Sequence, residues 1–318
     1  MLKLFKFEKY FTYLALIIFS FTVNYYVASR GVFPVDTFIH YDNGFKILLG
    51  ELPVRDYWIV HGFLIDYMQS VFFYLFGANW NSYIIHSSIF NVIISIFTYL
   101  ILTSLEIKNI YSIVISLLVS LLAYPVSGSP FLDLHAAYFL LLAIYILIFS
   151  ILKKKKSNWF FASFLLCVAF FCKQVPSAYA IAGISLYVIF YSIQKKTFKF
   201  ISLYLFGIII FLILFILFLK QQNILLSEIV LQLFLFPQSI GLDRYENYNL
   251  NLKNTFLDLK FVYLFFLPII CINLFKLIKF KNYYESESLQ IFLIISIFTL
   301  SLIFHQIYTK NQIYIFFL

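Results

Sequence analysis

Long apolar stretches separated by short polar segments form most of this chain. Nine of them carry almost no charge, and each comes close to the roughly 20 residues that a helix needs to cross about 30 Å of hydrocarbon. They cover residues 10–28, 82–104, 110–126, 134–152, 158–173, 176–193, 200–219, 259–278 and 288–305. This pattern predicts an all-α protein, a polytopic bundle of transmembrane helices.

A tenth apolar run begins near Ile313 and stops about six residues later, at Leu318. So short a helix does not cross a bilayer. We therefore expect nine to ten spans. Either the sequence is a fragment of a longer protein, truncated at its C-terminus, or the last helix only dips into the membrane, and we favour the fragment.

The composition indicates one membrane domain over residues 1–318. The chain is 63% hydrophobic and 12% charged, whereas a soluble domain carries roughly 25% charged residues. The three cysteines, Cys167, Cys172 and Cys271, all lie within predicted spans. Because their number is odd and none forms a Cys-x-x-Cys pair, the sequence argues against a disulfide framework or a cysteine-based zinc site.

The formal net charge is +9, and the distribution of the basic residues along the chain agrees with the predicted topology. With a cytoplasmic N-terminus, 14 of the 23 lysines and arginines fall in inside segments, although the outside loops are far longer. These residues are Lys3, Lys6, Lys9, Lys108, Lys153, Lys154, Lys155, Lys156, Lys195, Lys196, Lys199, Lys276, Lys279 and Lys281. Basic residues in short cytoplasmic loops set the orientation of membrane proteins. We therefore predict a cytoplasmic N-terminus and no nucleic-acid partner.

Residues 31–81, the loop between the first two predicted spans, concentrate the remaining charge. Five of the fourteen acids lie there: Asp36, Asp42, Glu51, Asp56 and Asp66. Charged groups just outside a membrane span indicate chemistry, or the binding of a charged molecule, at the membrane surface.

The same loop predicts two short helices. In residues 36–50 the apolar positions recur at three- and four-residue steps, which is typical of an amphipathic helix lying in the interface. Asp36, His40 and Asn43 would share one face of this helix. After a polar turn, residues 62–77 predict a second interfacial or partly inserted helix.

Residues 35–67 read VDTFIHYDNGFKILLGELPVRDYWIVHGFLIDY. An acid just after the first span, a helix ending in Leu-Leu-Gly, and the turn Pro-Val-Arg-Asp-Tyr with His-Gly-Phe-Leu resemble the first outside loop of the GT-C superfamily. This superfamily of integral-membrane glycosyltransferases includes protein O-mannosyltransferases and the aminoarabinose transferase of lipid A. Val54 and Phe63 depart from the pattern, where an aromatic residue and a proline are usual.

The resemblance implies a membrane enzyme that moves a sugar from a polyprenyl-phosphate or polyprenyl-diphosphate donor. The acceptor would be an envelope glycan, lipid or protein. The enzyme would sit in the cytoplasmic (inner) membrane, with its active site on the outer, periplasmic face. Such a reaction needs a carboxylate as general base and cations that stabilise the leaving phosphate.

The resemblance assigns the general base to Asp36, and a plain helix N-cap is the alternative. Arg55 suits phosphate through its bidentate fork, or it forms a salt bridge with Asp56 or Glu51. His61 either contacts phosphate or holds the turn.

Further expected substrate-binding residues are His40, Asp133 and Lys173. Lys173 either meets the donor phosphate or extends harmlessly to the interface. In the oligosaccharyltransferase branch of the superfamily, acids in the loop of Asp133 help to hold a divalent metal, and His135 would be a second ligand here. We expect no cofactor, with a divalent metal as the alternative.

Three other classes of function remain open. A transporter or a flippase of lipid-linked saccharide needs charges near the middle of the bilayer, and the predicted spans carry almost none. A polysaccharide polymerase or ligase would use a similar donor. A non-catalytic scaffold would tolerate the substitution Asp36→Asn, whereas an enzyme would lose turnover.

Overall fold

The computed structural model describes residues 2–31, 36–246 and 251–309 of the chain. Thirteen α-helices form nearly all of this part, which contains no β-strand. They are α1 (Leu2–Ala28), α2 (Ile39–Leu48), α3 (Leu64–Phe76), α4 (Trp80–Ser104), α5 (Asn109–Leu122), α6 (Leu132–Leu152), α7 (Asn158–Cys172), α8 (Gln174–Gln194), α9 (Lys199–Gln221), α10 (Leu226–Val230), α11 (Phe236–Glu246), α12 (Lys260–Lys279) and α13 (Glu287–Thr309). The predicted all-α fold is confirmed.

Eight helical segments in the described part are long and apolar enough to cross a membrane: α1, α4, α6, α8, α9, α12, α13, and α5 together with the 3-10 turn that follows it (Asn109–Val126, 18 residues). They match eight of the nine predicted spans. The ninth stretch, residues 158–173, forms α7, which has only 15 residues. The predicted tenth span, beginning near Ile313, lies outside the described residues.

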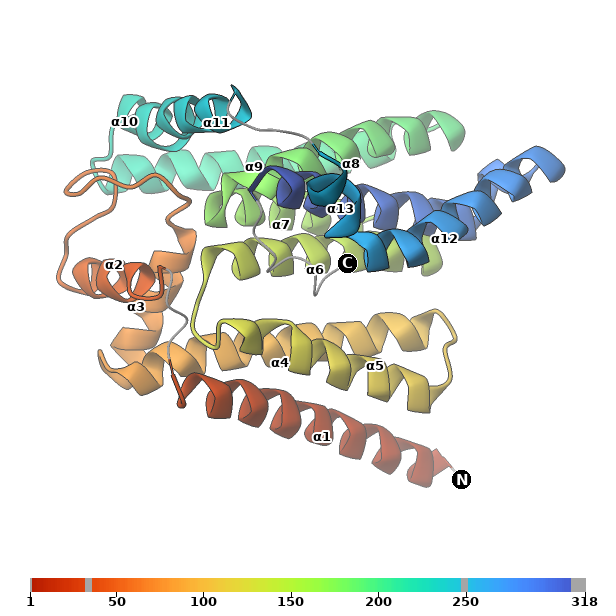
Figure 1. Ribbon diagram of the computed structural model, residues 1–318, viewed down its shortest axis with the longest axis horizontal. Coiled ribbons are helices and arrows are strands. Elements are labelled where there is room, and N and C mark those ends of the chain that lie inside the picture. Colours follow the sequence, from red (N-terminus) through yellow and green to blue (C-terminus); the bar gives the residue numbers. More distant parts are fainter. Residues whose placement is uncertain (1, 32–35, 247–250, 310–318) are drawn as a thin grey trace.

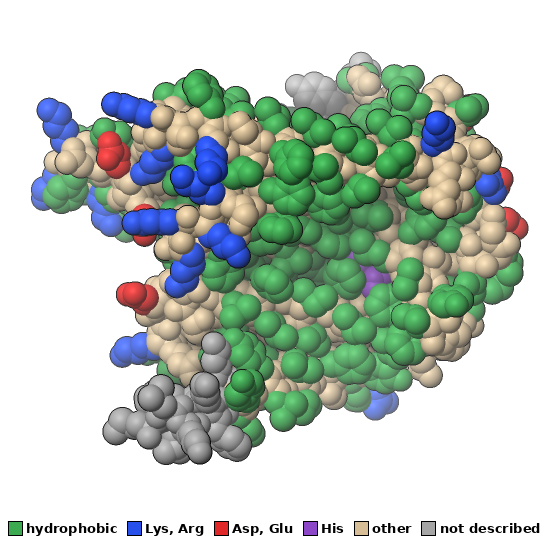
Figure 2. Space-filling view, turned by 180° about the vertical axis from the view of Figure 1, so that it is seen from behind, with side chains coloured by type: hydrophobic (Ala, Val, Ile, Leu, Met, Phe, Trp, Pro, Cys, Tyr) green, Lys and Arg blue, Asp and Glu red, His purple; other side chains and the backbone are tan. Residues whose placement is uncertain are grey.

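The long helices lie side by side with their ends at two opposite sides of the bundle (Figure 1). Helices α2 and α3 cap one end. The turns that follow α4, α6 and α8 lie at the other end. Figure 2 shows a broad apolar surface between the two ends, with lysines and arginines gathered at one of them. The basic residues therefore mark one side of a membrane-embedded bundle, as their distribution in the sequence predicts.

Helix α6 forms the centre of the bundle, and its side chains are buried along almost its whole length. Elsewhere, small polar side chains join the helices. The Asn24 amide on α1 donates to Ser87 Oγ, to Ser88 Oγ and to the Gly128 carbonyl at 3.0–3.1 Å. In a bilayer there is little hydrophobic drive between helices, so close packing and such hydrogen bonds hold them together.

The two helices predicted in the first outside loop are confirmed as α2 and α3. Gly50, at φ +91°, ends the turn after α2, a backbone conformation that glycine adopts at little cost. A Cβ on Gly44 would lie 2.8 Å from Gln69 Cγ. The absence of a side chain there lets α2 pack closely on α3, which brings the polar residues of the two helices together.

Candidate active site

A cavity of about 510 Å³ opens at the end of the bundle that carries the first outside loop. Its walls come from that loop, from the start of α6, from the junction of α7 and α8, and from α11 and α13. The described lining residues are Val60, His61, Leu132, Lys173, Gln174, Val175, Tyr179, Pro237, Ile240, Gly241, Phe304, His305 and Tyr308. Most of them are apolar, so the polar groups of His61, Lys173 and His305 stand out.

Lys173 lies where the chain is extended between two helices. Its backbone (φ −152°, ψ 127°) follows the end of α7, and Val175 is also extended. Proline disfavours helical geometry in the residue before it, so Pro176 accounts for the extended Val175. The break leaves the lysine side chain at the cavity rather than along a helix surface.

The Lys173 ammonium forms an ion pair with Asp133. Asp133 occupies the first turn of α6, where the helix dipole favours a negative charge. The side chain of Asp133 is only 4% exposed and that of Lys173 is 21% exposed. The ion pair therefore holds the Lys173 ammonium group at the wall of a mostly apolar cavity.

His61 reaches the cavity because Gly62 packs directly on the end of α7. A Cβ on Gly62 would lie 2.1 Å from the carbonyl oxygen of Phe171. The His61 Nδ1 lies 3.1 Å from the Gly62 carbonyl oxygen, so Nδ1–H donates and Nε2 keeps its lone pair. The turn between α2 and α3 is thereby fixed beside Lys173.

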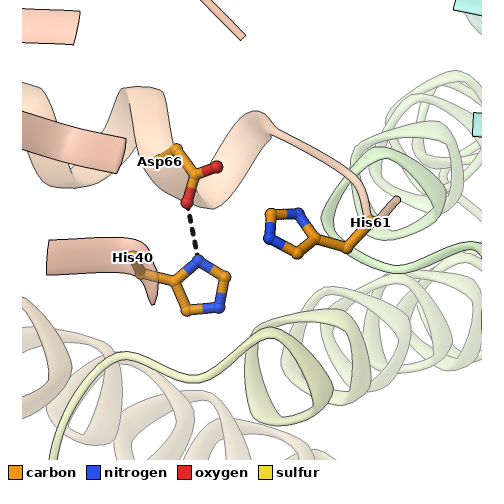
Figure 3. A group of neighbouring side chains, drawn as sticks. All are labelled: His40, His61 and Asp66. Carbon is orange, nitrogen blue, oxygen red and sulfur yellow. Dashed lines mark hydrogen bonds and ion pairs between the residues drawn. The ribbon is translucent and has the colours of Figure 1, made fainter. Parts of the chain in front are cut away.

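A second group of polar residues lies behind His61, between α2 and α3 (Figure 3). His40 Nδ1 lies 2.6 Å from Asp66 Oδ1, and the Asn43 amide donates to Asp66 Oδ2 at 3.0 Å. His40 and Asp66 are fully buried. The rings of His40 and His61 are 5.1 Å apart between centroids. Of the three residues predicted to share a helix face, His40 and Asn43 do so and face Asp66. The prediction is wrong for Asp36, which precedes α2 with φ +55° and is exposed.

Sequence reasoning missed Asp66 as a site residue. Asp66 lies on α3 among apolar residues, in the segment FLIDY, where a lone acid looks like the polar face of an interfacial helix. The sequence did contain a signal for Asp66. His40 and Asn43 share one face of the neighbouring helix, and such polar side chains need a hydrogen-bond partner when they are buried.

His86 and His135 form a separate buried network. The two Nε2 atoms lie 3.0 Å apart, His86 Nδ1 is 2.8 Å from Gln69 Oε1, and His135 Nδ1 is 2.7 Å from the Tyr124 hydroxyl. Both nitrogens of His135 thus have protein partners, while Asp133 pairs with Lys173. The two residues considered as a metal pair therefore face different neighbours. All five histidines of the chain, His305 included, lie in these groups or at the cavity.

Arg55 lies elsewhere. Its guanidinium bonds to the Asp56 carboxylate at 2.6–3.0 Å, and to the carbonyls of Gly50 and Gln222. The bond to Asp56 raises the pKa of Arg55, and the same bond lowers the pKa of Asp56. Arg55 lines a different hollow, of about 450 Å³, with Glu228. The structure shows the salt-bridge alternative for this residue.

Asp36 is exposed, and its backbone has φ +55°. The N-cap of α2 is Phe38, which makes no side-chain capping bond, so the plain N-cap role is not what places Asp36. It is not among the described residues that line the cavity. The structure thus brings together His40, His61, Asp133 and Lys173, and it leaves Asp36 and Arg55 outside the cavity wall.

A family model described as dolichyl-phosphate-mannose-protein mannosyltransferase matches residues 60–219, half of the chain. The chain belongs to the dolichyl-phosphate-mannose-protein mannosyltransferase family. Neither the curated proteins nor the solved structures contain a match to it. The protein is therefore an integral-membrane glycosyltransferase of the GT-C type, as the first outside loop indicates.

Within this mannosyltransferase family match lie His61, Asp66, Asp133 and Lys173. Asp36, His40 and Arg55 precede it. The cavity wall that carries the Lys173–Asp133 pair is thus built from the segment that establishes the family. The roles of the individual residues remain predictions.

The acid sensitivity of this family member should depend on His61. Burial lowers the pKa of His61 from its usual value of 6.5, and the Asp66 carboxylate opposes this effect only in part. Because the folded pKa lies below the unfolded one, the unfolded chain binds more protons as pH falls below 6.5. The stabilisation from neutral His61 is complete above pH 6.5 and is lost as pH falls through the folded pKa.

We therefore expect the unfolding free energy of the wild type to decrease between pH 7 and pH 5, by at most about 1.4 kcal/mol per pH unit from this group. In His61→Gln the decrease should be smaller. Thermal melts of both proteins in detergent across this range measure the difference. Equal pH dependence in the two proteins would contradict the assignment.

Proposed function

We propose that this glycosyltransferase takes its sugar from a polyprenyl-phosphate-type lipid donor and transfers it to an envelope glycan, lipid or protein. The reaction would take place on the outer face of the cytoplasmic membrane. The single observation that carries the proposal is the mostly apolar cavity of about 510 Å³ with the Lys173 ammonium in its wall. An apolar wall suits an isoprenoid tail, and the ammonium suits the phosphate that joins this tail to the sugar.

The proposed reaction forms one bond and breaks one. The acceptor hydroxyl oxygen attacks the anomeric carbon, the bond from that carbon to the phosphate oxygen breaks, and the lipid phosphate leaves. Its developing negative charge would be stabilised by Lys173, while Asp133 holds the ammonium in position. The hydroxyl proton passes to a carboxylate, which we assign to Asp36. His61 and His40 would bind substrate at the same end of the bundle. Arg55 would stabilise the loop through its ion pair with Asp56.

One contact supports Asp36 as the base. Its neighbour Thr37 is tied to the entrance of α6 through Tyr83. The Tyr83 hydroxyl lies 2.5 Å from the Thr37 carbonyl oxygen and 3.2 Å from the Pro130 carbonyl oxygen. Pro130 stands three residues before Asp133. The Tyr83 side chain thus bridges the segment that carries Asp36 and the loop that leads into Asp133.

A transporter or flippase is less well supported. In the described part of the eight candidate spans, the charged residues lie within the first or last turns, as Asp133 does in α6. The middle of the bundle therefore offers no row of charges for a path across the membrane. A polymerase or ligase would use a similar donor and would differ in the length of its product.

The test is a transfer assay with the detergent-purified protein and a panel of polyprenyl-phosphate and polyprenyl-diphosphate sugars. Asp36→Asn should lower turnover by about 10²–10⁴-fold, the usual contribution of a general base. Its melting temperature should stay close to that of the wild type, because Asp36 is exposed.

Asp42→Asn is the matched control. Asp42 is also exposed, and it pairs only with Lys46 one turn along α2, a contact worth little in water. It should keep turnover within a few-fold of the wild type. Transfer that survives Asp36→Asn would remove Asp36 from the mechanism. Lipid movement without any transfer would favour the flippase.

A further inference from the structure

We propose that His40, His61 and Asp66 bind a Zn²⁺ ion in the wall between the first outside loop and the cavity. One ligand atom from each residue lies within 4.8 Å of the other two. The three side chains come from three separate pieces of chain, namely α2, the turn at Gly62 and α3, and they point toward one another (Figure 3). This is the only such group among the described residues.

The ligand set suits a transition metal. Two imidazoles and one carboxylate, with a fourth position left for water or substrate, are the ligands of one class of catalytic zinc sites, and the same three ligands hold Fe²⁺ in non-haem iron oxygenases. Mg²⁺ and Ca²⁺ require oxygen ligands and would be poorly held by two ring nitrogens. A histidine must be neutral to bind a metal, and the Nδ1–H of His61 already donates to the Gly62 carbonyl.

The surroundings of the three residues also fit a metal site. In zinc sites, a ligating histidine donates its other N–H to a carbonyl or carboxylate, and a ligating carboxylate accepts a further hydrogen bond. His61 Nδ1 is paired with the Gly62 carbonyl, which leaves Nε2 for an ion. Asp66 Oδ2 accepts from the Asn43 amide, and Oδ1 contacts His40 Nδ1 at 2.6 Å, a contact within the group that a bound ion would replace. Each of these two ligands thus has its partner in place.

The protein leaves one atom of this group unsatisfied. His40 Nε2 is buried and has no hydrogen-bond partner in the described structure. A buried polar atom without a partner is uncommon and costs stability. Either nitrogen of His40 can serve the ion. Use of Nδ1 needs the 2.6 Å contact to Asp66 Oδ1 to widen, because two ligands about 2.0–2.1 Å from one tetrahedral zinc ion lie farther apart than that.

His61 lines the cavity, so the ion would stand at the cavity wall. One consequence rests on the proposed function, whereas the site itself does not: a phosphate oxygen of the donor would fill the fourth position. Lys173 and the ion would then contact the same phosphate from two sides.

The site can be tested without any substrate. The protein is purified without a histidine tag, stripped with EDTA, and dialysed against limiting ZnCl₂, after which bound zinc is measured by mass spectrometry. The wild type should retain about one ion per chain. His61→Gln and His40→Gln should lose it, and Zn²⁺ should raise the melting temperature of the wild type but not of these variants.

Two controls keep the result specific. Asp42→Asn changes an exposed acid on the same helix as His40, and His305→Gln removes a histidine from the same cavity. Both should retain zinc. His61→Gln is the decisive variant, because His61 is only half-buried and its loss need not unfold the protein.

Zinc retained by His61→Gln, or absent from the folded wild type, would overturn the proposal. Excess Mg²⁺ should not displace the zinc, and displacement by Mg²⁺ would also count against it. A failed transfer assay combined with zinc bound at these residues would overturn the proposed function alone.

Discussion

Replacing Lys173 by alanine is expected to lower the free energy of unfolding by about 3–5 kcal/mol, because it removes the cation from a buried carboxylate. The Asp133 side chain is only 4% exposed, so water cannot solvate its carboxylate in place of the lost ammonium. Sugar transfer should disappear as well. Thermal unfolding in detergent, followed by intrinsic fluorescence, should show a melting temperature several degrees below that of the wild type.

The double variant Lys173→Met, Asp133→Asn separates the two effects. It removes both charges while keeping side chains of similar size, a change that is often neutral for a buried ion pair. Stability should return to near the wild-type value, and transfer should stay absent because the phosphate has no cation. A Lys173→Ala protein as stable as the wild type would contradict the burial of this pair.

Replacing Gly62 by alanine should be almost as damaging. The added methyl group would lie 2.1 Å from the Phe171 carbonyl oxygen and 2.3 Å from its carbon. These are backbone atoms at the end of α7, so no side chain can move aside. The loop would have to retreat from α7 at a cost of about 3 kcal/mol. His61 would move away from Lys173, and transfer should fall with the melting temperature.

Gly31→Ala is the matched control. It lies in the same outside loop, and a Cβ there would meet nothing within 4 Å. Its effect on the unfolding free energy should stay within about 0.5 kcal/mol, as for most surface substitutions. A Gly62→Ala protein that behaves like Gly31→Ala would show that the loop does not depend on close packing against α7.

The membrane architecture follows from the sequence because the bilayer leaves few options. A stretch of apolar residues must form a helix to satisfy its backbone. The two short helices of the first loop were predicted from the spacing of their apolar residues, and the glycine at position 50 marks the end of the first one. The bounds of α7 were predicted to within one residue, because Lys173 and Pro176 interrupt the apolar run. Its status was not: the stretch was counted as a span, and the helix has only 15 residues.

The candidate site was predicted in part. The sequence identifies Lys173, His61, Asp133 and His40 as site residues, and the structure groups them at one end of the bundle. It does not reveal that Lys173 pairs with Asp133, because Asp133 lies at the start of α6 and Lys173 between α7 and α8, so that their contact depends on packing. Asp66 was missed for a similar reason. For Arg55 the sequence left two alternatives, phosphate or a salt bridge, and the structure contains the salt bridge with Asp56.

The shortness of α7 affects how deep the chemistry lies. Fifteen residues rise about 23 Å, whereas the hydrocarbon layer is about 30 Å thick. Helix α7 starts just after the basic turn at 153–156, so a helix that enters the hydrocarbon at this turn and runs along the membrane normal would end roughly 7 Å short of the opposite boundary. The Lys173 ammonium would thus attract a phosphate in a medium of lower dielectric constant than water, where the same two charges attract several times more strongly.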